Sequence, residues 1–251
     1  MENGQFLLIS CEHGGYQIPP PYRALFRDRQ LLLRSHYGYD AGALRLAREM
    51  AATLRAPLQA ATVSRLLIDL NRSPAHPRLY SSATRGLALA QRREIFERYY
   101  LPYRTAVQLR IASAVADGQR VLHVSCHSFT PMLNGKLRDT DLGLLYDPAR
   151  TSETMLCQRW QTSLKAGLPD LKIRRNVPYK GSADSFTAFL RRHFGDAQYV
   201  GVELEVNQRH VVSDSAAWPA LRRAIVDSLR TVLGHAAWPD RSCDCNNYRP
   251  S

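Results

Sequence analysis

The chain has 251 residues, of which 45% are hydrophobic and 22% charged, so it is long enough for one large domain with a substantial core. These fractions exclude a disordered chain, a collagen-like chain and a coiled coil. A run of about 18 apolar residues, as a membrane-spanning helix needs, is absent. The first residues lack the pattern of a signal peptide, so we expect a cytoplasmic protein.

The net charge of +12 suggests an anionic partner. Only four of the 34 basic residues are Lys, and the arginines are spread along amphipathic segments instead of forming one block. We expect most of them to cover solvent-exposed helix faces, which makes nucleic-acid binding the less favoured interpretation. The five cysteines are an odd number, and the pair Cys243 and Cys245 is too closely spaced to define a metal site by itself.

Apolar runs of strand length alternate with segments of helical period. In chain order, we predict a strand over residues 5–10, a helix from about residue 40, a strand over 61–70, a helix over 91–117 with a kink at Pro102, a strand over 120–126, a strand over 142–146, helices over 151–166 and 183–194, a strand over 199–206 and a helix over 216–235. This order predicts a single α/β domain with helices on both faces of a sheet, and residues 239–251 as a surface tail.

Reactive residues stand at the ends of several predicted strands, where ligands bind in open α/β sheets. His13 follows the first strand, and His127 follows RVLHVSC directly. Glu203 and Glu205 fall on one face of YVGVELEV, because strand side chains alternate. The other candidates at strand ends are Arg65, Asp69, Asn71 and Arg72.

A zinc hydrolase needs about three nitrogen or oxygen ligands and an open position for water. His13 and His127 suit the imidazole ligands, and Asp40 and Glu12 are the candidates for the carboxylate that completes the set. Such a ligand set fits zinc best among divalent ions.

The same chemistry needs a carboxylate base and a cation beside the developing oxyanion. Glu205 or Glu203 suits the base, and Arg65 suits the oxyanion. Asn71 and Arg72 suit a substrate carboxylate, because a guanidinium group can bind a carboxylate through two hydrogen bonds.

Each of these residues also has an ordinary structural interpretation. A His after a strand is more often a hydrogen-bonded loop residue than a ligand, and Asp69 would serve as a turn acceptor. A nucleophile–base pair of Cys126 and His127 is disfavoured, because neighbours on a strand point to opposite faces.

At these residues the sequence resembles the N-formylglutamate amidohydrolase family, particularly a shorter branch of it. The matching segments are SCEHGG (10–15), YDAGA (39–43), VSRLLIDLNRSP (63–74), HVSCHSFTP (123–131), GLLYDPAR (143–150), PYKGSADSFT (178–187) and VELEVNQ (202–208). Their order and spacing cover the chain from residue 7 to about residue 235.

The resemblance implies a zinc hydrolase of the phosphorylase/hydrolase-like fold with a mixed central sheet, related to zinc carboxypeptidases and aspartoacylases. It implies zinc ligation by His13 and His127 and binding of a substrate carboxylate by the pair Asn71-Arg72. Arg65 then matches the arginine that polarises the scissile carbonyl, and Glu205 matches the glutamate base.

One position departs from the family pattern. Tyr16 stands three residues after His13, where the relatives carry the Glu of an H-x-x-E motif. Asp40, in a segment shared with the family, is the preferred replacement, since Glu12 and His13 are neighbours whose side chains diverge in an extended segment. Asp184 is expected either in a loop over the substrate or as a helix N-cap.

The resemblance therefore predicts a zinc-dependent amidohydrolase, with one zinc per chain and a catalytic domain over residues 1–238. It would cleave the N-acyl bond of a small carboxylate-bearing amino acid such as N-formylglutamate. The alternative enzyme is a zinc carboxypeptidase-like or aminoacylase-like hydrolase of another N-acyl amino acid or small peptide. The non-enzymatic alternative, a basic nucleic-acid-binding protein on a degenerate hydrolase fold, is supported by the charge alone.

Overall fold

A six-stranded sheet forms the centre of the protein, which a computed structural model describes over residues 4–211 and 217–234. The strands are β1 (Gln5–Cys11), β2 (Leu58–Ala60), β3 (Arg120–Phe129), β6 (Leu142–Leu145), β7 (Ile173–Arg175) and β8 (Tyr199–Asn207), in the spatial order β2-β1-β3-β8-β6-β7. The first four strands in that order are parallel, β6 is antiparallel to β8, and β7 is parallel to β6. The sheet is therefore mixed, as expected.

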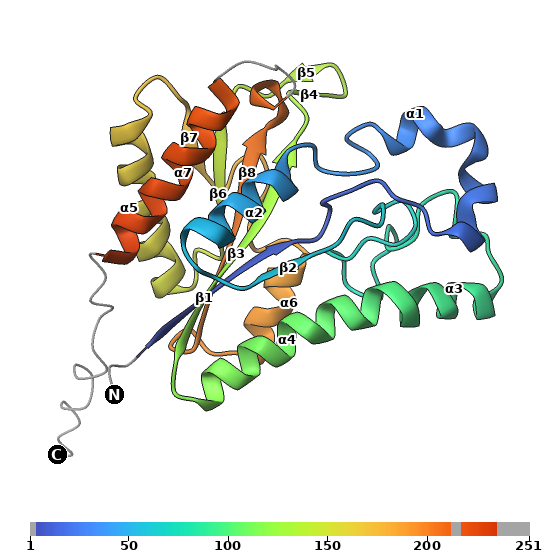
Figure 1. Ribbon diagram of the computed structural model, residues 1–251, viewed down its shortest axis with the longest axis horizontal. Coiled ribbons are helices and arrows are strands. Elements are labelled where there is room, and N and C mark those ends of the chain that lie inside the picture. Colours follow the sequence, from blue (N-terminus) through green and yellow to red (C-terminus); the bar gives the residue numbers. More distant parts are fainter. Residues whose placement is uncertain (1–3, 212–216, 235–251) are drawn as a thin grey trace, which may run out of the picture.

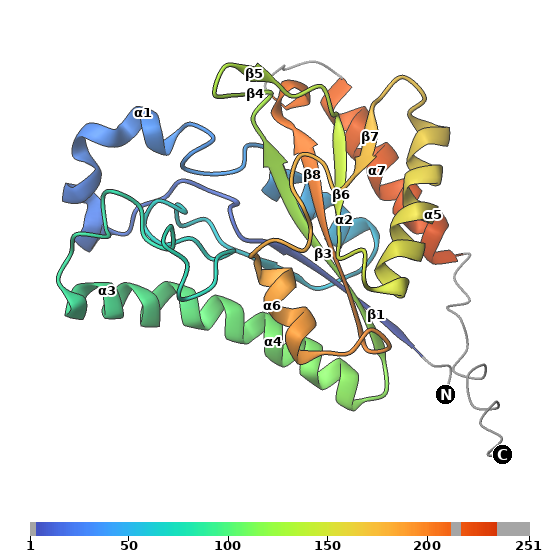
Figure 2. The same ribbon diagram turned by 180° about the vertical axis from the view of Figure 1, so that it is seen from behind.

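Helices cover both faces of this sheet (Figures 1 and 2). One face packs against α2 (Ala43–Thr53), α5 (Thr151–Gly167) and α7 (Ala217–Gly234), and the other against α4 (Leu101–Ala116) and α6 (Phe186–His193). The remaining elements are η1 (Pro20–Arg29), α1 (Gln30–Leu33), α3 (Leu89–Ile95), η2 (Phe96–Tyr100), the hairpin of β4 (Met132–Leu133) and β5 (Lys136–Leu137), and η3 (Gln208–His210). The predicted α/β class is confirmed. Among the described helices, none is long and apolar enough to cross a membrane.

Strand β3 shows how the sheet separates apolar from polar side chains. Leu122, Val124 and Cys126 point into the core beneath α2, α5 and α7. Because side chains alternate along a strand, His123 and His127 lie on the opposite face, and both are buried there. Buried polar groups need hydrogen-bond partners, so this face must supply them.

The strand predicted over residues 61–70 is wrong. Strand β2 ends at Ala60, and the following residues form turns, with an isolated bridge between Gln17 and Val63. Leu67 and Ile68 are nonetheless fully buried. A short apolar run packs into a core as turns as well as it does in a strand, so its hydrophobicity alone does not decide between them.

The long helix predicted over residues 91–117 is interrupted just before Pro102. Residues Phe96–Tyr100 form a π-helical turn between α3 and α4. Proline lacks the backbone N–H and crowds the carbonyl four residues earlier, so the regular hydrogen-bond ladder is lost there. The predicted helix over 216–235 is α7 in its described residues, and the tail over 239–251, with Cys243 and Cys245, lies outside the described residues.

The loop between β7 and α6 passes over β6 and β8 (Figure 2). Asn176 holds this loop in position, because its side-chain Oδ1 accepts hydrogen bonds from the backbone N–H groups of Tyr146 and Gly181 at 3.0 and 3.1 Å. Gly143 of β6 provides a flat contact surface: a Cβ atom there would lie 2.2 Å from the carbonyl oxygen of Val177 and 3.3 Å from the Cβ of Glu205. The loop can approach the sheet this closely only at a glycine.

Replacing Gly143 should therefore destabilise the protein. Gly143→Ala forces the loop away from β6, and overpacking of this kind lowers the free energy of unfolding by about 1–3 kcal/mol. Gly167→Ala, at the end of α5, is the matched control, because no heavy atom lies within 4 Å of its Cβ position. Urea unfolding measures both variants, and wild-type stability of Gly143→Ala would contradict this packing.

Candidate metal and catalytic site

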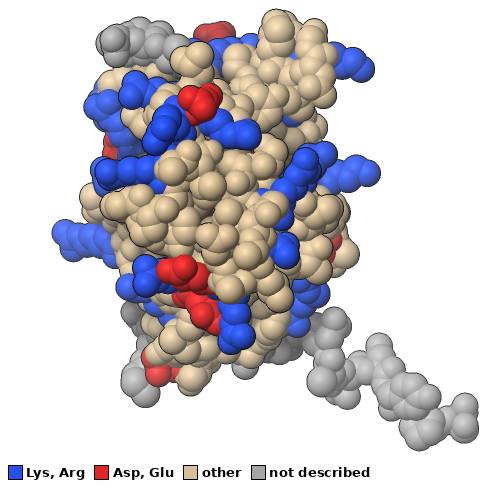
Figure 3. Space-filling model, turned by 90° about the vertical axis from the view of Figure 1, so that its right-hand side faces the viewer, with Lys and Arg blue, Asp and Glu red and all other residues tan. Residues whose placement is uncertain are grey.

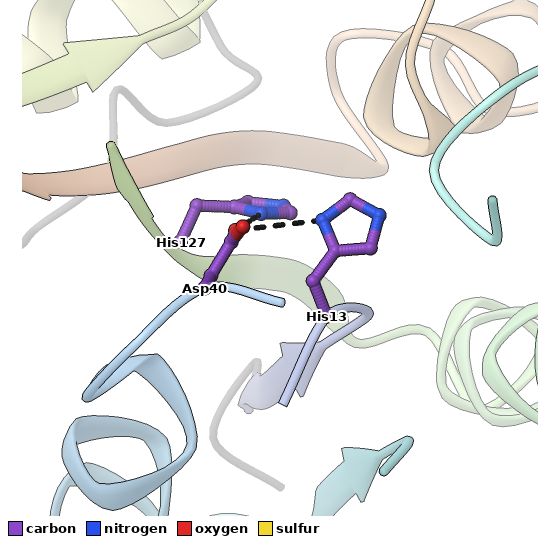
Figure 4. Close-up of side chains that lie close together, drawn as sticks. All are labelled: His13, Asp40 and His127. Carbon is purple, nitrogen blue, oxygen red and sulfur yellow. Dashed lines mark hydrogen bonds and ion pairs between the residues drawn. The ribbon is translucent and has the colours of Figure 1, made fainter. Parts of the chain in front are cut away.

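Three buried side chains from separate elements converge beside the end of the sheet (Figure 4). His13 lies in the turn after β1, Asp40 in the segment before α2, and His127 in β3. Their exposed fractions are 1%, 4% and 3%, and one ligand atom from each lies within 4.8 Å of the others. The backbone N–H of Asp40 donates to the carbonyl of His13 at 2.9 Å, which ties the two segments together.

Asp40 lies between the two histidine rings. Its Oδ2 is 2.8 Å from Nδ1 of His127 and 3.4 Å from Nδ1 of His13. On the far side of the His13 ring, Nε2 is 2.7 Å from Oδ1 of Asp69. The Nε2 hydrogen of a neutral His13 is then donated to Asp69, which leaves the Nδ1 lone pair facing Asp40. That Nδ1 has no hydrogen-bond partner among the described residues.

His127 is supported in the same way by Glu12. The Nε2 of His127 lies 3.2 Å from Oε2 of Glu12 and 3.0 Å from Oγ of Ser125, on the side of the ring away from Asp40. Burial opposes ionisation of Glu12, but its hydrogen bonds to His127 and Ser125 hold its pKa well below the usual range. Glu12 is therefore an anion behind His127 and not part of the converging group.

Glu12 is itself held in place by hydroxyl groups. Ser10 donates to its Oε1 at 2.7 Å and Tyr103 at 2.9 Å, while Ser125 donates to Oε2 at 2.5 Å. His123 continues the chain of contacts, with Nε2 at 2.7 Å from Ser10 Oγ. Every oxygen of this buried carboxylate thus has a partner, which fixes the orientation of His127.

The converging group offers three ligand atoms to a cation. In the metal-free protein, Nδ1 of the protonated His127 donates its hydrogen to Asp40. When that proton leaves, two imidazole lone pairs and one carboxylate face one another, and a metal ion between them would offset their repulsion. Burial opposes ionisation of Asp40, but its hydrogen bond with His127 and the charge of Arg65 hold its pKa below the usual range. Two imidazoles and a carboxylate, each supported from behind by a second group, fit a zinc ion.

Arg65 and Asp69 border this group. Arg65 donates from Nη1 to Asp40 at 3.1 Å and from Nη2 to Asp69 at 3.0 Å, and 24% of its side chain stays exposed. Asp69 also accepts from the backbone N–H of Asn71 at 3.0 Å. The turn-acceptor interpretation of Asp69 is thus confirmed, and the same carboxylate orients His13.

Glu203 and Glu205 lie on the face of β8 that carries the site. In the register of β3 and β8, Glu205 is opposite His127 and Glu203 is opposite Ser125. Glu203 accepts a hydrogen bond from Thr187 at 2.5 Å, whereas Oε2 of Glu205 has no partner in the described part of the chain. Burial, together with the charges of Asp40 and Glu203, raises the pKa of Glu205 to about 8.

Asn71, Arg72 and Asp184 meet at the start of α6. Oδ1 of Asn71 accepts from the backbone N–H of Phe186 at 2.7 Å, and Arg72 donates to the carbonyl oxygen of Asp184 at 2.8 Å. The carboxylate of Asp184 accepts from the backbone N–H of Ser73 at 3.0 Å. The N-cap of α6 is Ser185, so the N-cap interpretation of Asp184 is wrong.

Cys126 does not pair with His127. It points into the apolar core on the opposite face of β3, and burial raises the pKa of its thiol. The arrangement agrees with the alternation expected of neighbours on a strand.

Comparison with known proteins shows the family and the fold of the chain. The model of the N-formylglutamate amidohydrolase family matches residues 6–212. The chain belongs to the N-formylglutamate amidohydrolase family. A gene product of Agrobacterium tumefaciens has a similar structure, with 28% sequence identity, a TM-score of 0.76, and coverage of 92% of this chain and 91% of that one.

A structure of an N-formylglutamate amidohydrolase from Ralstonia eutropha JMP134 shares the fold. It has 20% identity and a TM-score of 0.68, with coverage of 92% of this chain and 94% of that one. Among curated protein sequences, none matches the chain.

The sequence does not reveal the groups that support the two histidines. It predicts Glu12 only as a candidate ligand, and it indicates no role for Ser10, Tyr103 or Ser125. One signal was present: in RVLHVSCHSF, polar residues recur at every second position between apolar ones. In a buried strand, such a pattern predicts a polar row that needs partners from its neighbours.

The support from Glu12 predicts a weaker metal site when its charge is removed. Glu12→Gln should lower zinc affinity about 10- to 100-fold, because the groups behind a ligating histidine fix its orientation and raise its basicity. A competition titration with a chromophoric chelator measures this. Glu153→Gln is the control: Glu153 is equally buried, but it pairs with Arg191. An equal loss in both variants would show general destabilisation and contradict the assigned role.

Zinc uptake should also release protons. Burial opposes protonation of His127, but hydrogen bonds to Asp40 and Glu12 outweigh it and raise its pKa well above the usual value. The metal-free ring is therefore protonated at pH 7, and a ligating nitrogen must lose that proton. Apparent zinc affinity should rise with pH, about tenfold per unit below that pKa. Calorimetry in buffers of different ionisation enthalpy measures the release, and pH-independent binding without it would contradict the assignment.

Proposed function

We propose that the protein is a zinc-dependent amidohydrolase that cleaves the N-acyl bond of a small carboxylate-bearing amino acid such as N-formylglutamate. A formyl group is the preferred candidate for the acyl group. The main support is the convergence of His13, Asp40 and His127 beside a buried Glu205, one oxygen of which has no hydrogen-bond partner among the described residues. Membership of the family supports hydrolysis of a carbon–nitrogen amide bond.

His13, Asp40 and His127 would hold the zinc ion through the atoms that face one another. When bound, zinc supplies a Lewis acid and lowers the pKa of water. Glu205 would accept the proton of the attacking water and later transfer it to the leaving amine. Its raised pKa suits both steps, since a group that titrates near neutral pH can take up and release a proton.

Arg65 would stabilise the oxyanion that develops on the acyl carbonyl. Its two hydrogen bonds to Asp40 and Asp69 fix the guanidinium, and the exposed part of its side chain leaves room for a substrate contact. A cation that is already in place stabilises the transition state without further reorganisation.

Arg72 and Asn71 would bind a substrate carboxylate. Each uses one polar atom to hold the start of α6, which leaves further guanidinium N–H groups on Arg72 and the amide N–H groups on Asn71. The backbone beneath them is fixed, because Arg104 and Tyr100 both donate to the carbonyl oxygen of Arg72. A preorganised pair of this kind binds a carboxylate with little loss of side-chain freedom.

Substitution of the two glutamates distinguishes their roles. Glu205→Gln should lower kcat about 10²- to 10⁴-fold while zinc content stays normal, since a general base contributes rate enhancements of that order. Glu203→Gln is the matched control on the same strand face and should keep most of the turnover, because Glu203 already binds Thr187. Equal losses in the two variants would contradict the assignment of Glu205.

Product analysis distinguishes the candidate reactions. The zinc-loaded protein should release formate from N-formylglutamate, which a coupled formate dehydrogenase assay detects. Release of acetate from N-acetyl amino acids, or of amino acids from dipeptides, in place of formate would favour an aminoacylase-like or carboxypeptidase-like enzyme. Hydrolysis of none of these amides would contradict the proposed function.

The basic charge does not by itself favour nucleic acid as the partner. On the face shown in Figure 3, Lys and Arg side chains lie in separate groups, with uncharged residues between them and Asp or Glu among them. Several arginines instead bind carboxylates or backbone carbonyls within the structure, as Arg65, Arg104 and Arg191 do.

A further inference from the structure

Arg138 lies over the end of the strand that carries His127. It follows strand β5, and its guanidinium carbon is 5.7 Å from the ring centre of Phe129, the last residue of β3. Phe129 is two positions after His127, so both side chains belong to the same face of that strand. The same guanidinium lies 4.9 Å from the ring centre of Tyr179, and its Nη1 donates to the Tyr179 hydroxyl at 2.9 Å.

Tyr179 comes from the loop that crosses the sheet beside Glu205. Val177 and Pro178, the two residues before it, lie against Gly143, which pairs with Glu205 in the register of β6 and β8. Partial desolvation of Tyr179, which stays 45% exposed, and the negative charge of Glu205 raise the pKa of its hydroxyl, so it keeps its hydrogen at neutral pH. Because that hydroxyl accepts from Arg138, its own hydrogen remains available to an incoming acceptor.

The charge of Arg138 is not neutralised within the described residues. Asp139 binds Lys172 and Arg174 at 3.2 and 2.9 Å. Asp141 binds Arg209 and His210, each at 2.5 Å. No described carboxylate lies within ion-pair distance of Arg138, whereas Arg65 is paired with both Asp40 and Asp69. A guanidinium without a counter-ion beside a proposed active site attracts an anionic group of the substrate.

We propose that Arg138 and Tyr179 form a second anion subsite, which binds a second carboxylate of the substrate. This inference rests on the proposed function, in which Arg72 and Asn71 bind the first carboxylate. Arg72 and Arg138 would then hold the two ends of an N-acyl dicarboxylic amino acid, with the acyl group directed to the metal. The guanidinium supplies two N–H donors and Tyr179 supplies an O–H donor, which matches the acceptor capacity of a carboxylate.

Substrates that differ by one charge test this subsite. The wild-type protein should have a KM for N-formylglutamate roughly 10- to 100-fold lower than for N-formylglutamine, as expected for hydrogen bonds to a charged group. Arg138→Gln should remove most of that preference by raising the KM for N-formylglutamate, with kcat little changed. Tyr179→Phe should remove a smaller part, and Arg138→Lys should restore part of it.

Lys136→Gln is the matched control, since it removes one positive charge from the same hairpin at an exposed position. It should leave the substrate preference as in the wild type. Thermal unfolding of each variant shows whether the packing of Arg138 on Phe129 and Tyr179 matters for the fold. An unchanged preference in folded Arg138→Gln, or an equal loss in Lys136→Gln, would overturn the subsite.

Calorimetry separates failure of the subsite from failure of the proposed function. The zinc-loaded protein should bind glutarate more tightly than pentanoate, and Arg138→Gln should abolish that difference. The same result without formate release from any substrate would support the subsite and contradict the proposed function. Formate release without any preference for a second carboxylate, in turnover and in binding, would support the function and overturn the subsite.

Discussion

The burial of Asp40 between two imidazole rings is the constraint on which the rest of the site depends. In the metal-free protein a proton on His127 offsets part of the buried negative charge, and the same three side chains would ligate a metal ion once that proton has left. The rest of the site is arranged around this constraint: Asp69 and Glu12 bind the outer nitrogens of His13 and His127, which fixes both rings with their inner nitrogens directed at Asp40. The sheet supplies the positions, and the outer carboxylates supply the orientation.

Burying so many charges requires a partner for each of them. Glu12 is surrounded by three hydroxyl groups, and Arg65 bridges Asp40 and Asp69. Glu205 is the exception, since one of its oxygens has no partner among the described residues and its pKa is raised to about 8. An unsatisfied buried carboxyl group is unfavourable for stability, and such groups occur where chemistry needs them.

The sequence was sufficient to predict the α/β class and the meeting of His13 and His127, because both follow predicted strands and both match the family pattern. It left Asp40 and Glu12 as alternatives for the third group, with Asp40 preferred, and the structure places Asp40 between the two rings. The sequence was insufficient for the turns over residues 61–70, since an apolar run of this length can form either a strand or a set of turns. It also did not predict that Arg138 and Tyr179 lie together. Their meeting depends on a loop crossing the sheet at Gly143, a contact between segments far apart in the chain.

The most direct test of the central claim is the metal content of the protein, purified without an affinity tag, combined with formate release from N-formylglutamate before and after chelation. We predict about one zinc ion per chain, loss of turnover when the metal is removed, and recovery when zinc is returned. Full turnover in a protein stripped of metal would contradict this prediction. A chain that takes up no zinc at neutral pH would contradict it too, because His13, Asp40 and His127 would then not form a zinc site.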